Sequence, residues 1–329
     1  MASKFNVKDI HAPDVVEKFD RLTLIDLKKL LLESDKFVAS DCPACKCEKT
    51  NYQFDYQGLS YRRCCECETL FISPAPTEQA HLDDVVRSSA MAYWRNNMPS
   101  EMKKSRRPMY TDRVSYFLAM QEKYGWSVQA SLEIGAGNGE FAEELASSAD
   151  IEKIVLLEPQ DLELEGKNIK IIKGGFEELR NSQEVTDIVF FWEVIEHILE
   201  PDNFLSLLRE VLSPGKPIIF STPNERSVET RELGTDSTNI LFDHVRLYNP
   251  YSITKLLNRN GFRVIDISTP GKLDVERLMN KHLANPDYFE NNTALQYILS
   301  QGSHVCDEFQ RFLQDKLRSS HMRVTAVVE

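Results

Sequence analysis

Short apolar runs alternate with segments of helical periodicity from about residue 130 onward. The apolar runs are rich in Val, Ile, Leu and Phe, and they have the length of buried strands. Between them, apolar residues recur every three or four positions, as in residues 205–212, where the pattern stops at Pro214-Gly215. Such alternation predicts an α/β fold, with a largely parallel sheet covered on both faces. The expected strands are a short run around Glu133 and then residues 154–158, 169–172, 187–191, 217–222, 262–268 and 323–328.

Three glycines at alternate positions follow the first of these strands. They are Gly135, Gly137 and Gly139, and a helical pattern begins soon after them. Glycine lets the backbone turn sharply from strand to helix, and it lets a ligand approach where a Cβ atom would block it. A dinucleotide-binding fingerprint would have its third glycine at position 140, where this chain has Glu140. The spacing therefore argues against a nicotinamide-cofactor oxidoreductase.

Two side chains downstream suit a nucleoside ligand at the same turn. Glu158 ends the second expected strand about 20 residues after the glycines, where α/β nucleotide sites place the acid that binds ribose hydroxyls. Phe176 follows the third strand, just beyond Gly174-Gly175, where an adenine ring would lie.

The glycine spacing behind an acidic residue resembles motif I of the class I S-adenosylmethionine-dependent methyltransferases. The resemblance covers about residues 110–270 and the last strand, with several motifs in the correct order. It implies a seven-stranded, Rossmann-like sheet whose last strand is antiparallel and inserted beside the fifth. It also implies S-adenosylmethionine as the cofactor. The cofactor-binding residues that it implies are Glu133, Gly135, Ala136, Gly137, Gly139, Glu158, Pro159, Phe176, Phe191 and Trp192.

Six of the seven cysteines fall between positions 42 and 67. Two C-x-x-C pairs, Cys42/Cys45 and Cys64/Cys67, are separated by 18 residues, the spacing of a tetrahedral Zn(Cys)₄ ribbon. Aromatic residues alternate around Gly58 between the pairs, as in a hairpin. Disulfides are the alternative, but the N-terminus lacks the apolar core of a secretory signal and indicates a reducing, cytoplasmic location. Four protein ligands leave no open position, so this zinc is expected to be structural.

These patterns divide the chain into four predicted parts. Residues 1–40 form an N-terminal helical segment, residues 41–77 the zinc ribbon, and residues 78–125 a helical linker that contributes to the acceptor site. Residues 126–329 form the methyltransferase domain. Its segment 272–320 is too long for a structureless loop and has helical spacing, which predicts a helical insertion before the last strand. A lid, a dimer surface and a simple packing appendage all fit this insertion.

Charge and hydropathy exclude two classes of partner. The formal net charge of −12 argues against a nucleic-acid backbone, since proteins that bind it usually display a basic face. No stretch approaches 18 uncharged apolar residues, so we expect no membrane span. We therefore expect a small-molecule acceptor; oligomerisation is left open.

The order of ribbon and methyltransferase motifs narrows the resemblance. With a ribbon before these motifs, the chain is similar to zinc-ribbon methyltransferases of sugar and surface-polysaccharide pathways, whose relatives methylate nucleotide-linked sugars. This resemblance implies that His244 is the catalytic base, His197 its partner and Tyr93 an acceptor-site residue. The sugar C-methyltransferases carry Glu-His where this chain has Asp243-His244, which leaves O- and C-methylation both open.

A second resemblance gives the histidine segment another meaning. Ubiquinone-pathway O-methyltransferases carry a similar E-x-x-E-H segment, associated there with a divalent metal. In this chain Glu193, Glu196 and His197 could hold Mg²⁺ beside a hydroxyl acceptor, or they could orient the backbone without a metal. A non-catalytic zinc-ribbon scaffold that keeps the fold is a further alternative.

Overall fold

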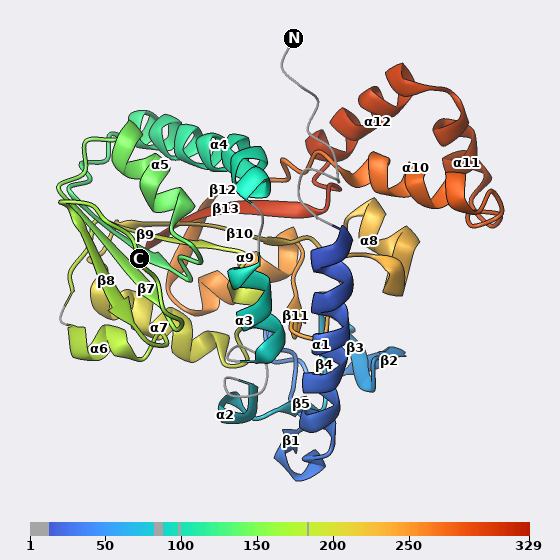
Figure 1. Ribbon diagram of the computed structural model, residues 1–329, viewed down its shortest axis with the longest axis horizontal. Helices are drawn as coiled ribbons and strands as arrows, with labels where there is room; N and C mark the ends of the chain where they lie inside the picture. Colours follow the sequence, from blue (N-terminus) through green and yellow to red (C-terminus); the bar gives the residue numbers. More distant parts are fainter. Residues whose placement is uncertain (1–12, 82–87, 98–99, 183) are drawn as a thin grey trace.

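The computed structural model describes residues 13–81, 88–97, 100–182 and 184–329. A central sheet fills one side of the molecule, a cysteine-bearing region lies beside its edge, and a helical arm extends from the other side (Figure 1). No helix in the described ranges is both long enough and apolar enough to span a bilayer.

The central sheet has seven strands in the order β12-β13-β10-β9-β6-β7-β8. Neighbouring strands are parallel except at β13, which is antiparallel to both β10 and β12. The predicted insertion of an antiparallel last strand beside the fifth is therefore confirmed. The strands are β6 (Ala130–Ile134), β7 (Lys153–Glu158), β8 (Ile169–Lys173), β9 (Ile188–Trp192), β10 (Pro217–Pro223), β12 (Phe262–Ser268) and β13 (His321–Val328).

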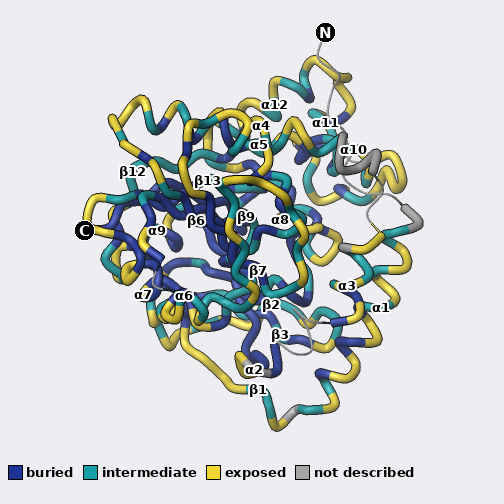
Figure 2. Tube along the Cα trace, turned by 60° about the vertical axis from the view of Figure 1, so that its left-hand side comes forward, coloured by how far each residue is buried: buried dark blue, intermediate teal, exposed yellow. Residues whose placement is uncertain are grey.

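Helices cover both faces of this sheet because successive strand residues point to opposite sides. In β9, Phe190 and Trp192 pack with one helical layer, whereas Val189 and Phe191 pack with the other. The strands are therefore apolar throughout, and the sheet is the buried centre of the molecule (Figure 2). One layer contains α4 (Ser100–Tyr124) and α5 (Glu140–Ser148), and the other contains α6 (Glu178–Ser182), α7 (Pro201–Val211) and α9 (Pro250–Arg259).

The cysteine ribbon, which we define as residues 41–77, forms a second sheet in the order β11-β4-β3-β2. The predicted hairpin is present, with Tyr56 paired to Leu59 at its turn. The fourth strand, β11, comes from the C-terminal half of the chain and pairs antiparallel with β4, so the ribbon is joined to the main body by a shared sheet. The strands are β2 (Thr50–Tyr56), β3 (Leu59–Cys64), β4 (Leu70–Ile72) and β11 (Arg246–Leu247), and a separate pair joins β1 (Phe37–Val38) to β5 (Ala75–Pro76).

Helices of the N-terminal part pack beside the ribbon. Leu27 and Leu30 lie in the ribbon's apolar core. The Asp26 carboxylate accepts hydrogen bonds from the Ala90 amide at 2.9 Å and the Ser89 hydroxyl at 2.7 Å, and it thereby ties the first helix to the start of the third. These helices are α1 (Pro13–Leu31), α2 (Glu78–His81) and α3 (Ser89–Asn96), with a short 3-10 turn at Ser34–Lys36.

The segment predicted as a helical insertion contains three helices. Together with α8 they enclose an apolar cluster of their own, which includes Leu233, Leu278 and Leu299. Figure 1 shows this arm projecting beyond the end of β13. The helices are α8 (Val228–Leu233), α10 (Asp274–Ala284), α11 (Thr293–Ser300) and α12 (Ser303–Asp315), and 3-10 turns occur at Ile195–His197 and Gly234–Asp236.

Candidate functional site

The glycine turn joins β6 to α5, as the sequence predicts. Gly135, Gly137 and Gly139 have φ values of +71°, +60° and +81°, in the left-handed region that side chains disfavour. A Cβ atom on Gly135 would lie 2.7 Å from Cγ2 of Val194, so this position also lacks the space for a side chain. The backbone geometry therefore requires glycine for two separate reasons.

Glu158 fixes this turn from the end of β7. Its side chain is buried, and Oε2 accepts a hydrogen bond from the Gly137 amide at 2.9 Å. Its other oxygen accepts from the Gln160 amide at 3.1 Å. One carboxylate thus holds the glycine loop and the turn after β7 in a fixed relation.

A cavity of about 240 Å³ opens at the carboxyl ends of β6, β7 and β9. We call it the first cavity. Four of the predicted cofactor residues line it, namely Gly135, Glu158, Pro159 and Phe176. Ala136, Gly137 and Gly139 shape the loop without lining this cavity in the described structure. Buried Glu133 lies behind the loop, and burial raises the pKa of its carboxyl to about 8.

The prediction that the Phe191–Trp192 backbone contacts the cofactor stays a prediction, and neither residue lines the first cavity. Phe191 is fully buried and stacks on Phe220 with ring centres 4.4 Å apart, and Trp192 lines a different cavity. The residues beyond the strand end, Glu193 and Val194, line the first cavity instead.

The second cavity, of about 390 Å³, lies next to the first. Its walls come from α4, the ends of β9, β10 and β13, the loop before β11, and the start of α10. Glu193 lines both cavities, so the two meet at this residue. The adjacency gives room for two ligands whose ends approach each other.

Glu193 has an unusual environment at this junction. Its φ is +55°, a conformation that a non-glycine residue adopts at a cost and that is often found at functional sites. Ser221 Oγ donates a hydrogen bond to Oε1 at 2.5 Å, and His321 Nδ1 lies 3.0 Å from Oε2. Burial opposes ionisation, but His321, Arg113 and Ser221 prevail and hold the pKa of Glu193 at about 2. The carboxylate is therefore charged at neutral pH.

Two histidines meet beside the junction. The His197 and His244 rings are 4.9 Å apart in an edge-to-face arrangement. His244 lines the second cavity and His197 the first. Their Nδ1 atoms lie 3.0 Å from the Asn239 carbonyl and 2.8 Å from the Asp243 carbonyl, respectively. A carbonyl only accepts, so each Nδ1 carries the proton and each Nε2 has a free lone pair. Burial lowers the pKa of His244 to about 4, which keeps its ring neutral.

Glu196 completes a compact group with this pair. Its Oε2 accepts a hydrogen bond from Thr222 at 3.0 Å, whereas no described residue bonds to its buried Oε1. Burial, and then the nearby charge of Glu193, raise the pKa of Glu196 well above its usual value. Potential ligand atoms of Glu196, His197 and His244 lie within 4.8 Å of one another. This group differs from the predicted magnesium set, in which Glu193 took the place of His244.

The N-terminal part contributes a histidine that the sequence analysis missed. His81 at the end of α2 is buried, lines the first cavity, and has no hydrogen bond to a described residue at either ring nitrogen. Burial lowers its pKa to about 4. Tyr93 lines neither cavity, and its ring lies 4.6 Å from the Lys18 amine; Met91, on the same helix, lines the first cavity. No local spacing marks His81, because only the docking of the ribbon brings it to the site.

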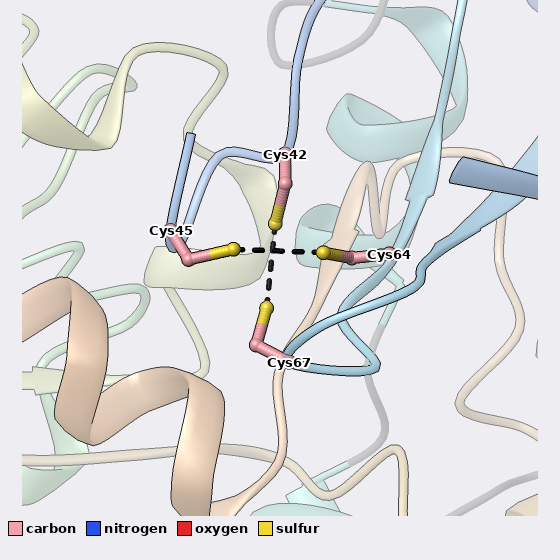
Figure 3. A group of neighbouring side chains, drawn as sticks. All are labelled: Cys42, Cys45, Cys64 and Cys67. Atoms are coloured by element: carbon pink, nitrogen blue, oxygen red, sulfur yellow. Dashed lines mark hydrogen bonds between the residues drawn. The ribbon is translucent and has the colours of Figure 1, made fainter. Parts of the chain in front are cut away.

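The four cysteines predicted as metal ligands converge on one point (Figure 3). Sγ of Cys42 lies 3.4 Å from that of Cys67, and Sγ of Cys45 lies 3.5 Å from that of Cys64. Zn–S bonds of about 2.3 Å in a tetrahedron imply sulfur separations of roughly 3.8 Å. The donor set and its size thus fit one Zn²⁺ ion.

The two cysteine pairs also have the same backbone geometry. Lys46 and Glu68, one residue after each second cysteine, have φ values of +61° and +58°. Their amides donate to the Cys42 and Cys64 carbonyls at 2.9 and 3.2 Å. This equivalence is expected of two knuckles that present sulfur atoms to a shared ion.

The ribbon holds the loop that carries His244. The Tyr61 hydroxyl donates to the Leu241 carbonyl at 2.8 Å, and the Ile72 amide donates to the Val245 carbonyl at 3.1 Å. The loop is thus bonded on both sides of His244 to strands β3 and β4.

Comparisons with known proteins agree with this geometry. The model of a family described as a methyltransferase domain matches residues 84–267, more than half of the chain. A probable S-adenosylmethionine-dependent methyltransferase of Mycolicibacterium smegmatis is 30% identical over 140 residues, which are 41% of this chain and 52% of that protein. Ubiquinone biosynthesis O-methyltransferases of Coxiella burnetii are 24% identical over 151 residues, 42% of this chain and 64% of theirs. The chain thus spans less than two thirds of the length of these relatives.

Solved structures of methyltransferases are similar to the chain at low identity. An S-adenosylmethionine-dependent methyltransferase from Archaeoglobus fulgidus is 20% identical with a TM-score of 0.44, covering 67% of this chain and 94% of that one. The plantazolicin methyltransferase BpumL is 15% identical with a TM-score of 0.45, covering 76% and 93%.

Proposed function

We propose that this chain, which belongs to the methyltransferase domain family, is an S-adenosylmethionine-dependent methyltransferase whose acceptor is a sugar, either nucleotide-linked or a glycan precursor. The observation that carries this proposal is the meeting of two cavities at Glu193, with His244 facing the second. Support for a sugar comes from the cysteine ribbon and its bonds to the His244 loop, the combination that the sequence resemblance associates with sugar methylation.

The first cavity fits S-adenosylmethionine. Buried Glu158 suits the ribose hydroxyls, Phe176 suits the adenine, and Gly135 lines the same cavity without a side chain. When bound, the cofactor supplies a methyl group on a sulfonium, which is transferred by in-line displacement. The chain's part is to align the acceptor and to receive a proton.

His244 is the proposed proton acceptor. The Asn239 carbonyl fixes the proton on Nδ1, which leaves Nε2 to accept one in the second cavity. Its low pKa keeps the ring unprotonated at neutral pH, as a base requires. His197 packs edge-on against it and is itself held by the Asp243 carbonyl. Glu193 serves as a fixed negative charge at the junction, since a carboxyl with a pKa of about 2 is too weak a base.

We further propose that Cys42, Cys45, Cys64 and Cys67 bind one structural Zn²⁺. Four thiolates close the coordination shell, so the ion takes no part in the reaction. Its contribution is to the folding of the ribbon and, through Tyr61 and Ile72, to the position of the His244 loop.

A divalent-metal O-methyltransferase of the ubiquinone-pathway type is the second candidate. The grouping of Glu196, His197 and His244 within 4.8 Å favours it, because a carboxylate and two imidazoles are a common donor set. Here His244 would be a ligand and could not act as the base.

Purified protein should be incubated with S-adenosylmethionine and a panel of nucleotide-linked sugars, and the products followed by mass spectrometry. We expect a gain of about 14 Da on at least one sugar, the mass of a methyl group replacing hydrogen, and this gain should survive EDTA because the proposed zinc site is closed. Methylation of phenolic acceptors alone, lost on chelation and restored by a divalent ion, would establish the second candidate instead.

A further inference from the structure

The second cavity has a basic wall in an acidic protein. Five Lys or Arg side chains line it, against two carboxylates, whereas the chain as a whole has a net charge of −12. The basic residues are Arg106, Arg113, Lys272, Arg277 and Arg323.

Both carboxylates of this cavity already have cationic or hydroxyl partners. Asp112 lies 2.8 Å from Arg323, and Glu193 is bonded to Ser221 and His321. Lys272 and Arg277 form no ion pair with either of these carboxylates, so their charge is available to a ligand, whereas Arg113 also acts on Glu193 and lowers its pKa.

Arg277 is a largely buried cation whose guanidinium lacks hydrogen bonds to the described residues at two of its nitrogens. Its side chain is only 11% exposed, and its buried Nε and Nη1 have no hydrogen-bond partner among the described residues. The nearest carboxylate oxygen, on Glu229, is 3.9 Å away, beyond hydrogen-bond distance, and Glu229 itself accepts bonds from Ser237 and Asn239. A buried guanidinium without bonds to its N–H groups is costly, which indicates that a ligand completes this one.

Two further cations extend the same wall. The Arg113 guanidinium lies 4.7 Å from the Trp192 ring centre and makes no hydrogen bond to a described residue. Lys272 is exposed and lines the cavity just before the start of α10. Glu193 lies at the boundary where this cavity meets the first one. An anion is therefore attracted to Lys272 and Arg277 and repelled from Glu193.

We propose that the methyl acceptor carries an anionic oxygen group, a phosphate or a carboxylate, which Arg113, Lys272 and Arg277 bind. This inference rests on the proposed function, because it takes the second cavity as the acceptor site. With the anion held at the basic wall, the reactive part of the acceptor is directed to His244 and Glu193. Guanidinium groups suit this task, since their forked N–H donors match the oxygens of both anions.

The test is anion binding to the full chain saturated with S-adenosylhomocysteine. Inorganic pyrophosphate and malonate are titrated separately by calorimetry at low salt, so that the two arms distinguish a phosphate from a carboxylate site. We expect one of them to bind, and Arg277→Gln and Arg113→Gln each to weaken binding by about ten- to 100-fold, as loss of charge-assisted hydrogen bonds does. Arg180→Gln is the matched control, because this exposed arginine pairs with Glu210 on the far layer and should leave binding unchanged.

Lys272→Gln keeps the test independent of folding, because the side chain is exposed; it should weaken binding by about three- to tenfold. S-adenosylhomocysteine affinity should be unchanged in every variant. The inference is overturned if neither anion binds to wild type. It is also overturned if Lys272→Gln and Arg113→Gln bind the anion as tightly as wild type does. Anion binding with the expected losses, but no methylation of any sugar, would instead overturn the proposed acceptor and leave this inference standing.

Discussion

Replacement of Glu158 by glutamine tests whether the first cavity binds the cofactor, because Glu158 both lines this cavity and holds the glycine loop. The carboxylate accepts two backbone N–H groups, at 2.9 Å from Gly137 and 3.1 Å from Gln160, and it lines the first cavity. The amide of glutamine has the same shape but only one oxygen, so one N–H group would face another donor. In the proposed site a ribose hydroxyl also donates to this carboxylate, and loss of one hydrogen bond to a charged group is worth about 1.5–3 kcal/mol. We therefore expect S-adenosylhomocysteine to bind about ten- to 150-fold more weakly.

Calorimetric titration of S-adenosylhomocysteine measures this loss, with the melting temperature as a check on folding. Glu163→Gln is the control: this exposed carboxylate is close in sequence and lines neither cavity in the described structure, so its removal should leave affinity unchanged. A folded Glu158→Gln variant with affinity within about twofold of wild type would refute the assignment of the first cavity to the cofactor.

Three other changes have defined outcomes. Elemental analysis should find one zinc per chain; Cys64→Ser should lose the ion and lower the melting temperature, whereas Cys47→Ser should do neither, because only the former belongs to the converging set. The pKa of His81 is depressed from 6.5 to about 4, so its contribution to stability is present above pH 6.5 and is lost as the pH falls toward 4. In His81→Phe the free energy of unfolding, measured with urea at a series of pH values, should fall by up to about 3 kcal/mol less than in wild type between pH 6.5 and 4. Replacement of exposed His304 should leave this fall unchanged. His244→Ala should lower kcat by about 10²–10⁴-fold with cofactor affinity near wild type, and an unchanged kcat would exclude it as the base.

Local patterns were enough to predict the sheet and the cofactor loop. The apolar runs of β6, β7, β9 and β10 are buried on both faces, so their period and length are visible in the sequence. Gly135 and Glu158 were predictable for the same reason, because each lies directly at the end of such a run. Phe191 and Trp192, which do not line the first cavity, show where this reasoning loses precision. A strand end can be placed to within one or two residues, and one residue decides which way a side chain points.

The acceptor side depends on contacts between distant parts of the chain. His81, His197, His244 and His321 come from four separate segments, and no spacing relates them. The bonds between Glu193 and His321 require β13 to lie beside β10, and the position of His81 requires the ribbon to dock. The lack of hydrogen bonds from described residues to Nε and Nη1 of Arg277 is likewise a property of the folded arm and is invisible in the sequence.

The ribbon links a structural metal site to the chemistry through one short strand. Strand β11, which directly follows the His244 loop in the sequence, pairs with ribbon strand β4. The Tyr61 hydroxyl of the ribbon also donates a hydrogen bond to this loop at Leu241. The residues of this loop form no strand or α-helix of their own, so its position depends on such contacts with neighbouring elements. A base must be held within hydrogen-bond reach of its proton, so the precision of His244 depends on the rigidity of the ribbon. Under the proposed function, zinc influences the reaction only through the position of this loop, because four cysteines leave the ion no open position for a substrate.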